Sequence, residues 1–423
     1  MSLDLAVSAE DDDVAGLCRF IDASPSPFHV ADTVASMLAA AGFAELREAE
    51  EWRPRDGGGP GRFFVRREGT IAAWQTQASE SVAQGFRVVG GHTDSPNLRI
   101  KPNSAVASYG WDQLGVEVYG GPLLTTWLDR DLGLSGRVAL RDKTAPGGVS
   151  QRLVRLEEPL LRVANLAIHL DRTAATDGVK LNPQSHLAPI WGATGAAPSL
   201  REWLAERLGV LPTDVLAHDL MTHDLTPARR FGHANDLVAA PRLDNLATAY
   251  AGTRALLQVA DMPTTQTPVL VLFDHEEIGS MTNRGAFSSF LPGLLERIVA
   301  SRGGGRIDYL RALADTIVCS ADMAHATHPN YADRHEPQHH IAINGGPVLK
   351  VNVKGRYASD APGAAAFALA CEQAQVPMQT FVVRSDLPCG STIGPMTAAL
   401  SGAVTVDVGA PMLSMHSARE MCG

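Results

Sequence analysis

Near-continuous apolar segments of four to six residues recur through the second half of this 423-residue chain. Segments of this length are typical of strands that helices bury on both faces, as in a largely parallel sheet. An amphipathic segment, residues 243–260, precedes the first of them and predicts a helix. The pattern therefore indicates an α/β fold. The apolar segments are Pro268–Phe273, Thr316–Ser320, Thr380–Val383 and Val404–Val408.

The first hundred residues predict elements of the same kind. Residues 14–42 predict two helices separated at Pro25 and Pro27, because proline lacks an N–H and clashes inside a helix. Thr70–Trp74 and Phe86–Val89 are short apolar runs bounded by turn residues, and they predict strands. This part of the chain therefore fits with the α/β half that follows residue 235.

The sequence pattern changes between about residues 100 and 235, where the long apolar segments are absent. Glycine and aspartate separate its β-like segments, and residues 171–235 predict mostly loops with one helix near 199–208. We therefore predict an inserted, β-rich domain over 100–235, and a discontinuous second domain formed by 1–99 and 236–423. The segments that predict strands in the insert are Gly115–Tyr119, Gly136–Leu140 and Asn165–Leu170.

Charge and cysteine content narrow the class of protein. The net charge is −10 and no lysine or arginine tract is present, so we expect no nucleic-acid partner. No run of 18 apolar residues predicts a membrane span. Five cysteines without a CxxC pair fit a reducing compartment, and the acidic first residues do not resemble a secretory signal. We therefore expect a cytoplasmic protein.

Histidine and carboxylate residues follow three of the predicted strands. His92 comes after Phe86–Val89, the pair Glu276 and Glu277 after Pro268–Phe273, and Asp322 after Thr316–Ser320. Ligands of open α/β sheets commonly bind outside the carboxyl ends of strands, which favours convergence of these side chains. A surface-loop histidine and a solvated acidic turn are the alternatives for His92 and for the glutamate pair.

Two further residues could complete a site. Asp244 begins the predicted helix, where aspartate is also an ordinary N-cap, but a carboxylate can bridge two cations. His416 follows Val404–Val408 and would otherwise be a structural histidine near the end of the chain. His325 and His328 could be ligands, although positions behind the metal ligands or in the wall of the pocket suit them better.

Taken together, two histidines and three carboxylates favour zinc, with cobalt or manganese as alternatives. Two such ions polarise a carbonyl and activate water, which indicates hydrolysis of an amide or ester. Of two adjacent glutamates, one can bind metal while its neighbour serves as general base. Asp94, two residues from His92, can take the second ring proton of that histidine. Neither a GxSxG nor an HExxH motif is present.

Over nearly its whole length the chain resembles the aspartyl aminopeptidases, the M18 family of metallopeptidases. The resemblance implies a zinc-peptidase-like α/β domain, with a mixed, largely parallel central sheet flanked by helices, interrupted by a β-rich dimerisation domain. The matching segments are Ser24–His29, Gly91–Pro96, Arg242–Asn245, Asp274–Ser280, His328–Tyr331, Arg384–Pro395 and Ser414–Ser417.

Roles in the site follow from the same resemblance. It implies one metal ion on His92, Asp244 and Asp322, and a second on Asp244, Glu277 and His416, with Asp244 as the bridge. Glu276 would be the general base for the metal-activated water, and Asp94 would orient His92.

The resemblance also implies peptide substrates with an amino-terminal Asp or Glu, and assembly from dimers into a dodecamer. Lys350 is the first candidate to bind the acidic side chain, because a desolvated carboxylate needs a cation. His169 resembles a histidine that a dimer partner contributes, and Tyr357 and Arg384 are further candidates for substrate binding. The alternatives are a two-metal aminopeptidase or deacylase of other specificity, and a non-catalytic oligomeric homologue.

Overall fold

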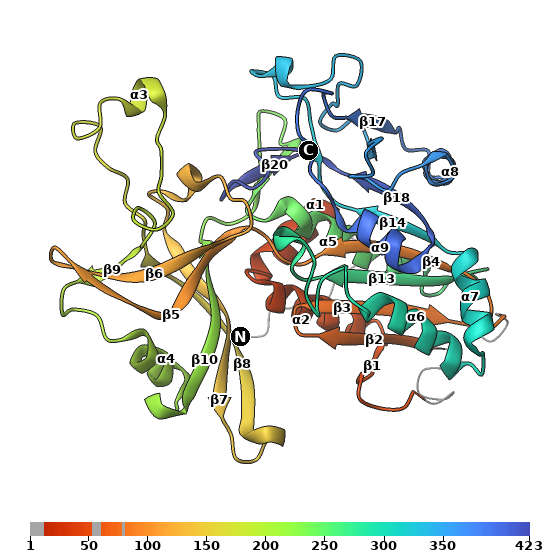
Figure 1. The fold of residues 1–423 in the computed structure, drawn as a ribbon, viewed down its shortest axis with the longest axis horizontal. Coiled ribbons are helices and arrows are strands. Elements are labelled where there is room, and N and C mark those ends of the chain that lie inside the picture. Colours follow the sequence, from red (N-terminus) through yellow and green to blue (C-terminus); the bar gives the residue numbers. More distant parts are fainter. Residues whose placement is uncertain (1–11, 53–60, 78–80) are drawn as a thin grey trace. The chain divides into compact units, whose positions relative to one another are not determined.

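The computed structural model describes residues 12–52, 61–77 and 81–423 (Figure 1). The acidic first residues considered above lie outside the described part. The chain divides into two compact units, of which the first comprises Met1–Asp94, Ala228–Met415 and Glu420–Gly423. The second comprises Ser95–Pro227 and His416–Arg419. The predicted domains, 1–99 with 236–423 and 100–235, stay a prediction; the compact units divide a few residues earlier at both ends of the insert.

A mixed nine-stranded sheet forms the centre of the first unit, in the order β1-β2-β3-β13-β4-β14-β18-β16-β17 (Figure 1). Its middle strands β13, β4, β14 and β18 run parallel to one another. Antiparallel pairs flank them, between β3 and β13 on one side and between β18 and β16 on the other. The expected α/β fold, with a mixed and largely parallel sheet, is therefore confirmed.

Strand β13 shows why the apolar segments form this sheet. Leu270 and Leu272 belong to one core cluster with helices α1, α2 and α5. Val269, Val271 and Phe273 belong to another with helices α6, α7 and α9. Because successive side chains of a strand point to opposite faces, an unbroken apolar run is buried on both.

A five-stranded sheet in the order β11-β12-β20-β19-β15 completes the first unit. Strand β20 contains Glu420 and pairs with β12. Strand β12 comes just before helix α5 in the sequence. The sheet therefore joins the last residues of the chain to the start of α5, more than 170 residues earlier in the sequence.

The second unit contains a six-stranded sheet in the order β8-β7-β10-β5-β6-β9, in which every pair is antiparallel. Its core side chains include Leu98, Leu134, Val138 and Leu220. Helix α4 begins with a capping box, in which Ser199 and Glu202 satisfy each other's backbone N–H groups. This helix confirms the prediction near residues 199–208.

Two local predictions in this unit are corrected. Asn165–Leu170 does not form a strand but a loop that ends in a turn, so its alternation of apolar residues has no partner strand. A ten-residue strand, β10, lies where the sequence predicted loops, because its buried residues include the polar Thr222, His223 and Asp224 and so form no apolar pattern. No helix in residues 12–52, 61–77 and 81–423 is long and apolar enough to cross a membrane.

The helices are α1 (Asp13–Ala23), α2 (Pro27–Ala40), α3 (Ala174–Asp177), α4 (Leu200–Leu208), α5 (Leu243–Val259), α6 (Phe290–Ser301), α7 (Arg306–Ala314), α8 (Ala361–Gln373) and α9 (Ile393–Ser401). The strands are β1 (Ala44–Glu45), β2 (Gly61–Arg67), β3 (Thr70–Thr76), β4 (Phe86–His92), β5 (Asn97–Ser108), β6 (Trp111–Tyr119), β7 (Leu132–Arg141), β8 (Val149–Leu161), β9 (Ile190–Ala193), β10 (Val215–Asp224), β11 (Arg229–Phe231), β12 (Leu237–Ala240), β13 (Thr267–Phe273), β14 (Ile317–Ala321), β15 (Ala324–His325), β16 (Val348–Val351), β17 (Gln379–Val382), β18 (Val404–Gly409), β19 (Pro411–Leu413) and β20 (Glu420–Cys422).

Candidate metal centre

Three neighbouring parallel strands end at the same edge of the large sheet. Strand β4 ends with His92, which pairs with Phe273, the last residue of β13. Strand β14 ends at Ala321, directly before Asp322. The carboxyl ends of the strands therefore bring His92, the turn after β13 and Asp322 together, as expected for a binding edge of an α/β sheet.

Asp244 reaches this edge from helix α5, but not as a helix cap. The N-cap position is Arg242, in the left-handed conformation with φ 58°, and no side chain caps the helix there. The backbone N–H of Asp244 donates to Glu420 Oε2 at 3.0 Å, and Asn245 Nδ2 donates to the carbonyl of Ala321 at 2.9 Å. The capping alternative for Asp244 is therefore wrong.

Glycine beside His92 permits the close approach of α5 to β4. A Cβ atom on Gly91 would lie 3.1 Å from Thr248 Cγ2 and 3.3 Å from Asn245 Nδ2, both on α5. A residue with a Cβ would press on these side chains at the start of the helix that carries Asp244. The glycine thus fixes how near the helix lies to the strand.

His92, Asp244 and Asp322 point their ligand atoms at one another. His92 Nε2 lies 3.2 Å from Asp244 Oδ1 and 3.5 Å from Asp322 Oδ1. Ligands about 2.1 Å from a tetrahedral zinc ion are about 3.4 Å apart, so both separations fit a shared metal ion. All three side chains are buried, and each can offer a ligand atom within 4.8 Å of the others.

Asp94 links this group to the turn after β13. Its Oδ1 accepts the backbone N–H of Glu276, and its Oδ2 that of Glu277, both at 3.1 Å. His92 Nδ1 lies 3.0 Å from the Asp94 carbonyl oxygen and 3.4 Å from Oδ1. This contact leaves Nε2 free to face the carboxylates, as in metal-binding histidines with a carboxylate behind them.

Glu276 and Glu277 occupy a 3₁₀ turn, and both can approach His92 closely enough to share a metal ion with it. Burial raises the pKa of Glu276 to about 8, against the opposing influence of His92. Burial and the neighbouring Asp244 raise the pKa of Glu277 well above its usual value. Carboxyl groups gathered in this way fit a dication, whose charge offsets their mutual repulsion.

The pKa of His92 is raised as well. Burial alone would lower the pKa of this histidine, but its contacts with Asp244, Asp322 and Asp94 outweigh burial and raise the pKa well above its usual value. Metal binding at this site should therefore compete with protons, because zinc binds neutral imidazole and ionised carboxylate.

His416 belongs to the short segment that packs with the second unit. Its Nδ1 faces the carbonyl oxygen of Gly121 at 3.0 Å. A backbone carbonyl at Nδ1 favours a proton there and leaves Nε2 unprotonated, as metal-binding histidines require. The predicted role of His416 as a ligand stays a prediction.

The predicted substrate-binding residues differ in their surroundings. Lys350 is 2% exposed; its Nζ donates to the Met323 carbonyl at 2.8 Å and lies 3.6 Å from Asp322 Oδ2. Tyr357 is buried, with its ring centre 5.4 Å from Lys350 Nζ. Arg384 is already paired with Asp386 at 2.6 Å. None of these contacts tests substrate binding.

The other candidate histidines differ in their surroundings. Burial lowers the pKa of His325, and the charges of Lys350, Asp244 and Asp322 also act on it. His169 is exposed in the turn of the second unit. The ring of His325 contacts that of Phe381 at 5.8 Å, and the ring of His328 contacts that of Tyr331 at 4.8 Å.

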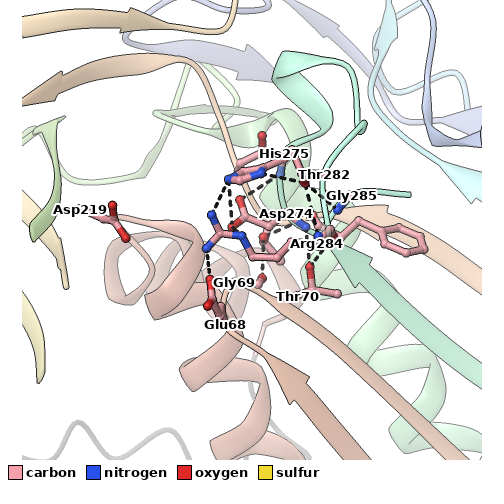
Figure 2. A network of polar contacts seen from close by, with 12 residues as sticks. Glu68, Gly69, Thr70, Asp219, Asp274, His275, Thr282, Arg284 and Gly285 are labelled. Carbon is pink, nitrogen blue, oxygen red and sulfur yellow. Dashed lines mark hydrogen bonds and ion pairs between the residues drawn. The ribbon is translucent and has the colours of Figure 1, made fainter. Parts of the chain in front are cut away.

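Two features of the site escaped the sequence patterns. Glu420, which anchors Asp244, is 3% exposed, and only its presence in the conspicuous segment after His416 could have drawn attention to it. A polar network of Glu68, Asp274, His275, Thr282 and Arg284 lies beside the glutamate turn (Figure 2). Four of its members lie within residues 274–284, but Glu68 comes from a distant turn, so no local pattern connects it with them.

A mixed sheet whose parallel strand ends present buried histidine and carboxylates is the arrangement of a metal-dependent hydrolase. Residues 20–423 match the family described as aminopeptidase I zinc metalloprotease (M18). The chain belongs to this M18 family of metal-dependent aminopeptidases.

Known relatives extend over most of the chain. A protein of Mycobacterium bovis described as probable M18 family aminopeptidase 2 is 54% identical over 417 residues, covering 96% of this chain and 94% of its own. A Streptomyces coelicolor protein of the same description is 49% identical, covering 96% and 93%.

Solved structures agree in fold. A chain in the Ape4 and Nbr1 complex superposes with a TM-score of 0.93 and 37% identity, covering 97% of this chain and 82% of its own. The mApe1 dodecamer of S. cerevisiae gives a TM-score of 0.85 and 28% identity, covering 97% and 93%.

Proposed function

We propose that this aminopeptidase uses two divalent metal ions, zinc in the first instance, to remove an amino-terminal Asp or Glu from peptides. The observation that carries the two-metal part is the meeting of His92, Asp244 and Asp322 beside Glu276 and Glu277. One ion would be held by His92, Asp244 and Asp322. The second would be held by Asp244, Glu277 and His416, with Asp244 as the bridging ligand.

When bound, the ions supply Lewis-acid chemistry that polarises the scissile carbonyl and makes water nucleophilic at neutral pH. Glu276 acts as the general base: it takes a proton from the attacking water and passes it to the leaving amine. Burial raises its pKa to about 8, which supports a group that can exchange a proton near neutral pH. Asp94 holds Glu276 in place through its backbone N–H.

Lys350 is the proposed partner of the acidic substrate side chain. An ammonium group has three N–H donors, and one of them goes to the Met323 carbonyl. A buried cation attracts a carboxylate strongly because little water competes for it. Tyr357 and Arg384 would form further parts of this pocket, and His169 would come from a partner subunit.

The assembly we propose is a dimer-based dodecamer in the cytoplasm. The similarity to the S. cerevisiae dodecamer supports the assembly. The five cysteines are all free, which supports a reducing compartment.

The two glutamates give a matched pair of tests for the mechanism. Glu276→Gln should keep both zinc ions and lower kcat by about 10²–10⁴-fold, the usual contribution of a general base. Glu277→Gln should lose the second ion. Zinc content by mass spectrometry and kcat on an Asp-arylamide measure both effects. Turnover near that of the wild type in Glu276→Gln would refute the base assignment.

Specificity needs a separate test. Asp-, Glu-, Leu- and Lys-arylamides should show the highest kcat/KM for the two acidic substrates, and Lys350→Met should remove that preference while zinc content stays the same. A preference for Leu would instead favour a two-metal aminopeptidase of other specificity. Absence of any chelator-sensitive hydrolysis would indicate a non-catalytic homologue.

A further inference from the structure

Arg284 lies at the centre of a polar network beside the turn that carries Glu276 and Glu277 (Figure 2). Its side chain is 14% exposed. One of its nitrogens donates to His275 Nε2 at 2.9 Å, a second pairs with Glu68, and its Nε lies 3.6 Å from Asp274 Oδ2. A single guanidinium thus joins the turn of residues 274–280 to the turn between β2 and β3.

The backbone of the glutamate turn adopts an unusual conformation that needs such support. His275 and Ser280 are non-glycine residues with positive φ, 68° and 61°, and Gly279 between them has φ 93°. Left-handed backbone in residues that carry a Cβ costs free energy and persists where surrounding contacts over-determine it. The contacts of the His275 ring are therefore relevant to where Glu276 and Glu277 lie.

The ring of His275 is held from both sides, and Arg284 fixes its proton. Because a guanidinium can only donate, His275 Nε2 must accept and the ring proton must sit on Nδ1. That proton faces Thr282 Oγ1 at 2.9 Å. The same Oγ1 accepts the backbone N–H of Gly285 at 3.1 Å, so it also fixes the path of the chain beyond the turn.

Asp274 and Gly69 connect the network to the loop of His92. Asp274 Oδ1 accepts the N–H of His275 at 2.9 Å, and a Cβ atom on Gly69 would lie 2.5 Å from Asp274 Oδ2. The carbonyl of Gly69 accepts the hydroxyl of Thr93, the residue after His92, at 2.8 Å. The turn between β2 and β3 therefore contacts both segments that supply the metal site.

We propose that Arg284 is a positioning residue for the reaction, an inference that rests on the proposed roles of Glu276 and Glu277. Asp94 holds the N–H groups of the glutamates on one side of the turn. Arg284 holds His275 on the other, and so fixes the direction in which the turn presents Glu276. It would act through His275 and not by direct contact with the reacting groups.

The decisive experiment is a double-mutant cycle with the general base. Arg284→Gln should lower kcat on an Asp-arylamide by about 10–100-fold at saturating zinc, with KM changed less than about threefold, because small misplacements of a catalytic group have effects of this size. In the Glu276→Gln background the same substitution should lower kcat less than about threefold, since the group it positions is gone. Equal loss in both backgrounds, or no loss in the first, would overturn the proposal.

Two further variants distinguish an effect of Arg284 on the position of Glu276 from an effect on the stability of the fold. Arg284→Lys keeps the charge but cannot reach His275, Glu68 and Asp274 together, so it should recover part of the lost kcat. Arg62→Gln is the matched control, because Arg62 also joins distant segments by donating to the carbonyls of Ala41 and Ala260. It should lower Tm as Arg284→Gln does while kcat stays within about twofold of the wild type. A similar loss of kcat in both variants would show a purely structural role for Arg284. Normal turnover of Glu276→Gln by itself would instead refute the assignment of Glu276 as general base, on which this inference rests.

Discussion

Replacing Asp94 with Asn should weaken metal binding while preserving the fold. The wild-type carboxylate accepts two backbone N–H groups at 3.1 Å, from Glu276 and Glu277, and lies 3.4 Å from His92 Nδ1. The amide of Asn has one oxygen and one NH₂ group, so it can accept only one of the two N–H groups and turns a donor toward the other. Glu276 and Glu277 would then lose their common anchor.

The magnitude follows from those contacts. A hydrogen bond to a charged group contributes about 1.5–3 kcal/mol, so the loss of one, with a buried donor left unsatisfied, should cost about 2–4 kcal/mol in the free energy of unfolding. Residues behind metal ligands typically change metal affinity or activity by about 10–100-fold. We therefore expect Kd for zinc to rise by about 10–100-fold, which corresponds to about 1.4–2.7 kcal/mol.

The assay is competition for zinc against a chromophoric chelator, together with kcat at saturating zinc. Asp407→Asn is the control, because Asp407 is equally buried and accepts hydrogen bonds from Ser320 Oγ at 2.5 Å and Thr392 Oγ1 at 2.6 Å. The control should lower Tm but leave Kd for zinc within about threefold of the wild type. An unchanged Kd in Asp94→Asn, alongside a lowered Tm, would refute the role given to Asp94.

Two further predictions follow from the burial of the site. With metal removed by chelator, stability should fall as pH rises from about 5 to 8: burial raises the pKa of Glu276 to about 8, so the folded chain holds a proton that the unfolded chain releases near pH 4.5. Urea denaturation at several pH values measures this, and a flat profile would contradict the linkage. Gly409→Ala would place a Cβ 1.7 Å from the carbonyl oxygen of Asp322, so it should lower stability by roughly 1–3 kcal/mol and weaken zinc binding. Tm and zinc content check this. A variant with both unchanged would show that the backbone around Asp322 and Gly409 can move to make room for the Cβ.

Much of the first compact unit could be predicted because the middle strands of its large sheet are buried on both faces. The apolar segment Pro268–Phe273 predicts β13 almost to the residue, and β18 follows Val404–Val408 equally well. The ends of such strands also locate His92 and Asp322. Local composition is informative here because the surroundings of the strand are uniform along its length.

The insert could be predicted less well because its sheet is half exposed. Strand β10 does not alternate buried and exposed residues: its last five residues, 220–224, are all buried, and polar residues such as Thr222 and His223 are among them. Conversely, Asn165–Leu170 alternates like a strand while Leu166, Ile168 and Leu170 are exposed. Alternation specifies a strand only where a neighbour completes its hydrogen bonds, and the neighbour is not visible in local sequence.

Support for the site could not be predicted for a similar reason. Arg284 contacts Glu68 across 216 positions, and Asp244 contacts Glu420 across 176. Such partners depend on how strands are ordered in the sheet, which a single sequence does not specify. The proposed site residues themselves stand out because histidine and carboxylate are unusual directly after apolar strands.

The most direct measurement of the central claim is a zinc-edge anomalous diffraction map of the metal-loaded protein. We expect two peaks about 3.5–4 Å apart with Asp244 between them, as in other two-metal hydrolytic sites. A single peak, or two peaks without a shared Asp244 ligand, would contradict the proposed centre.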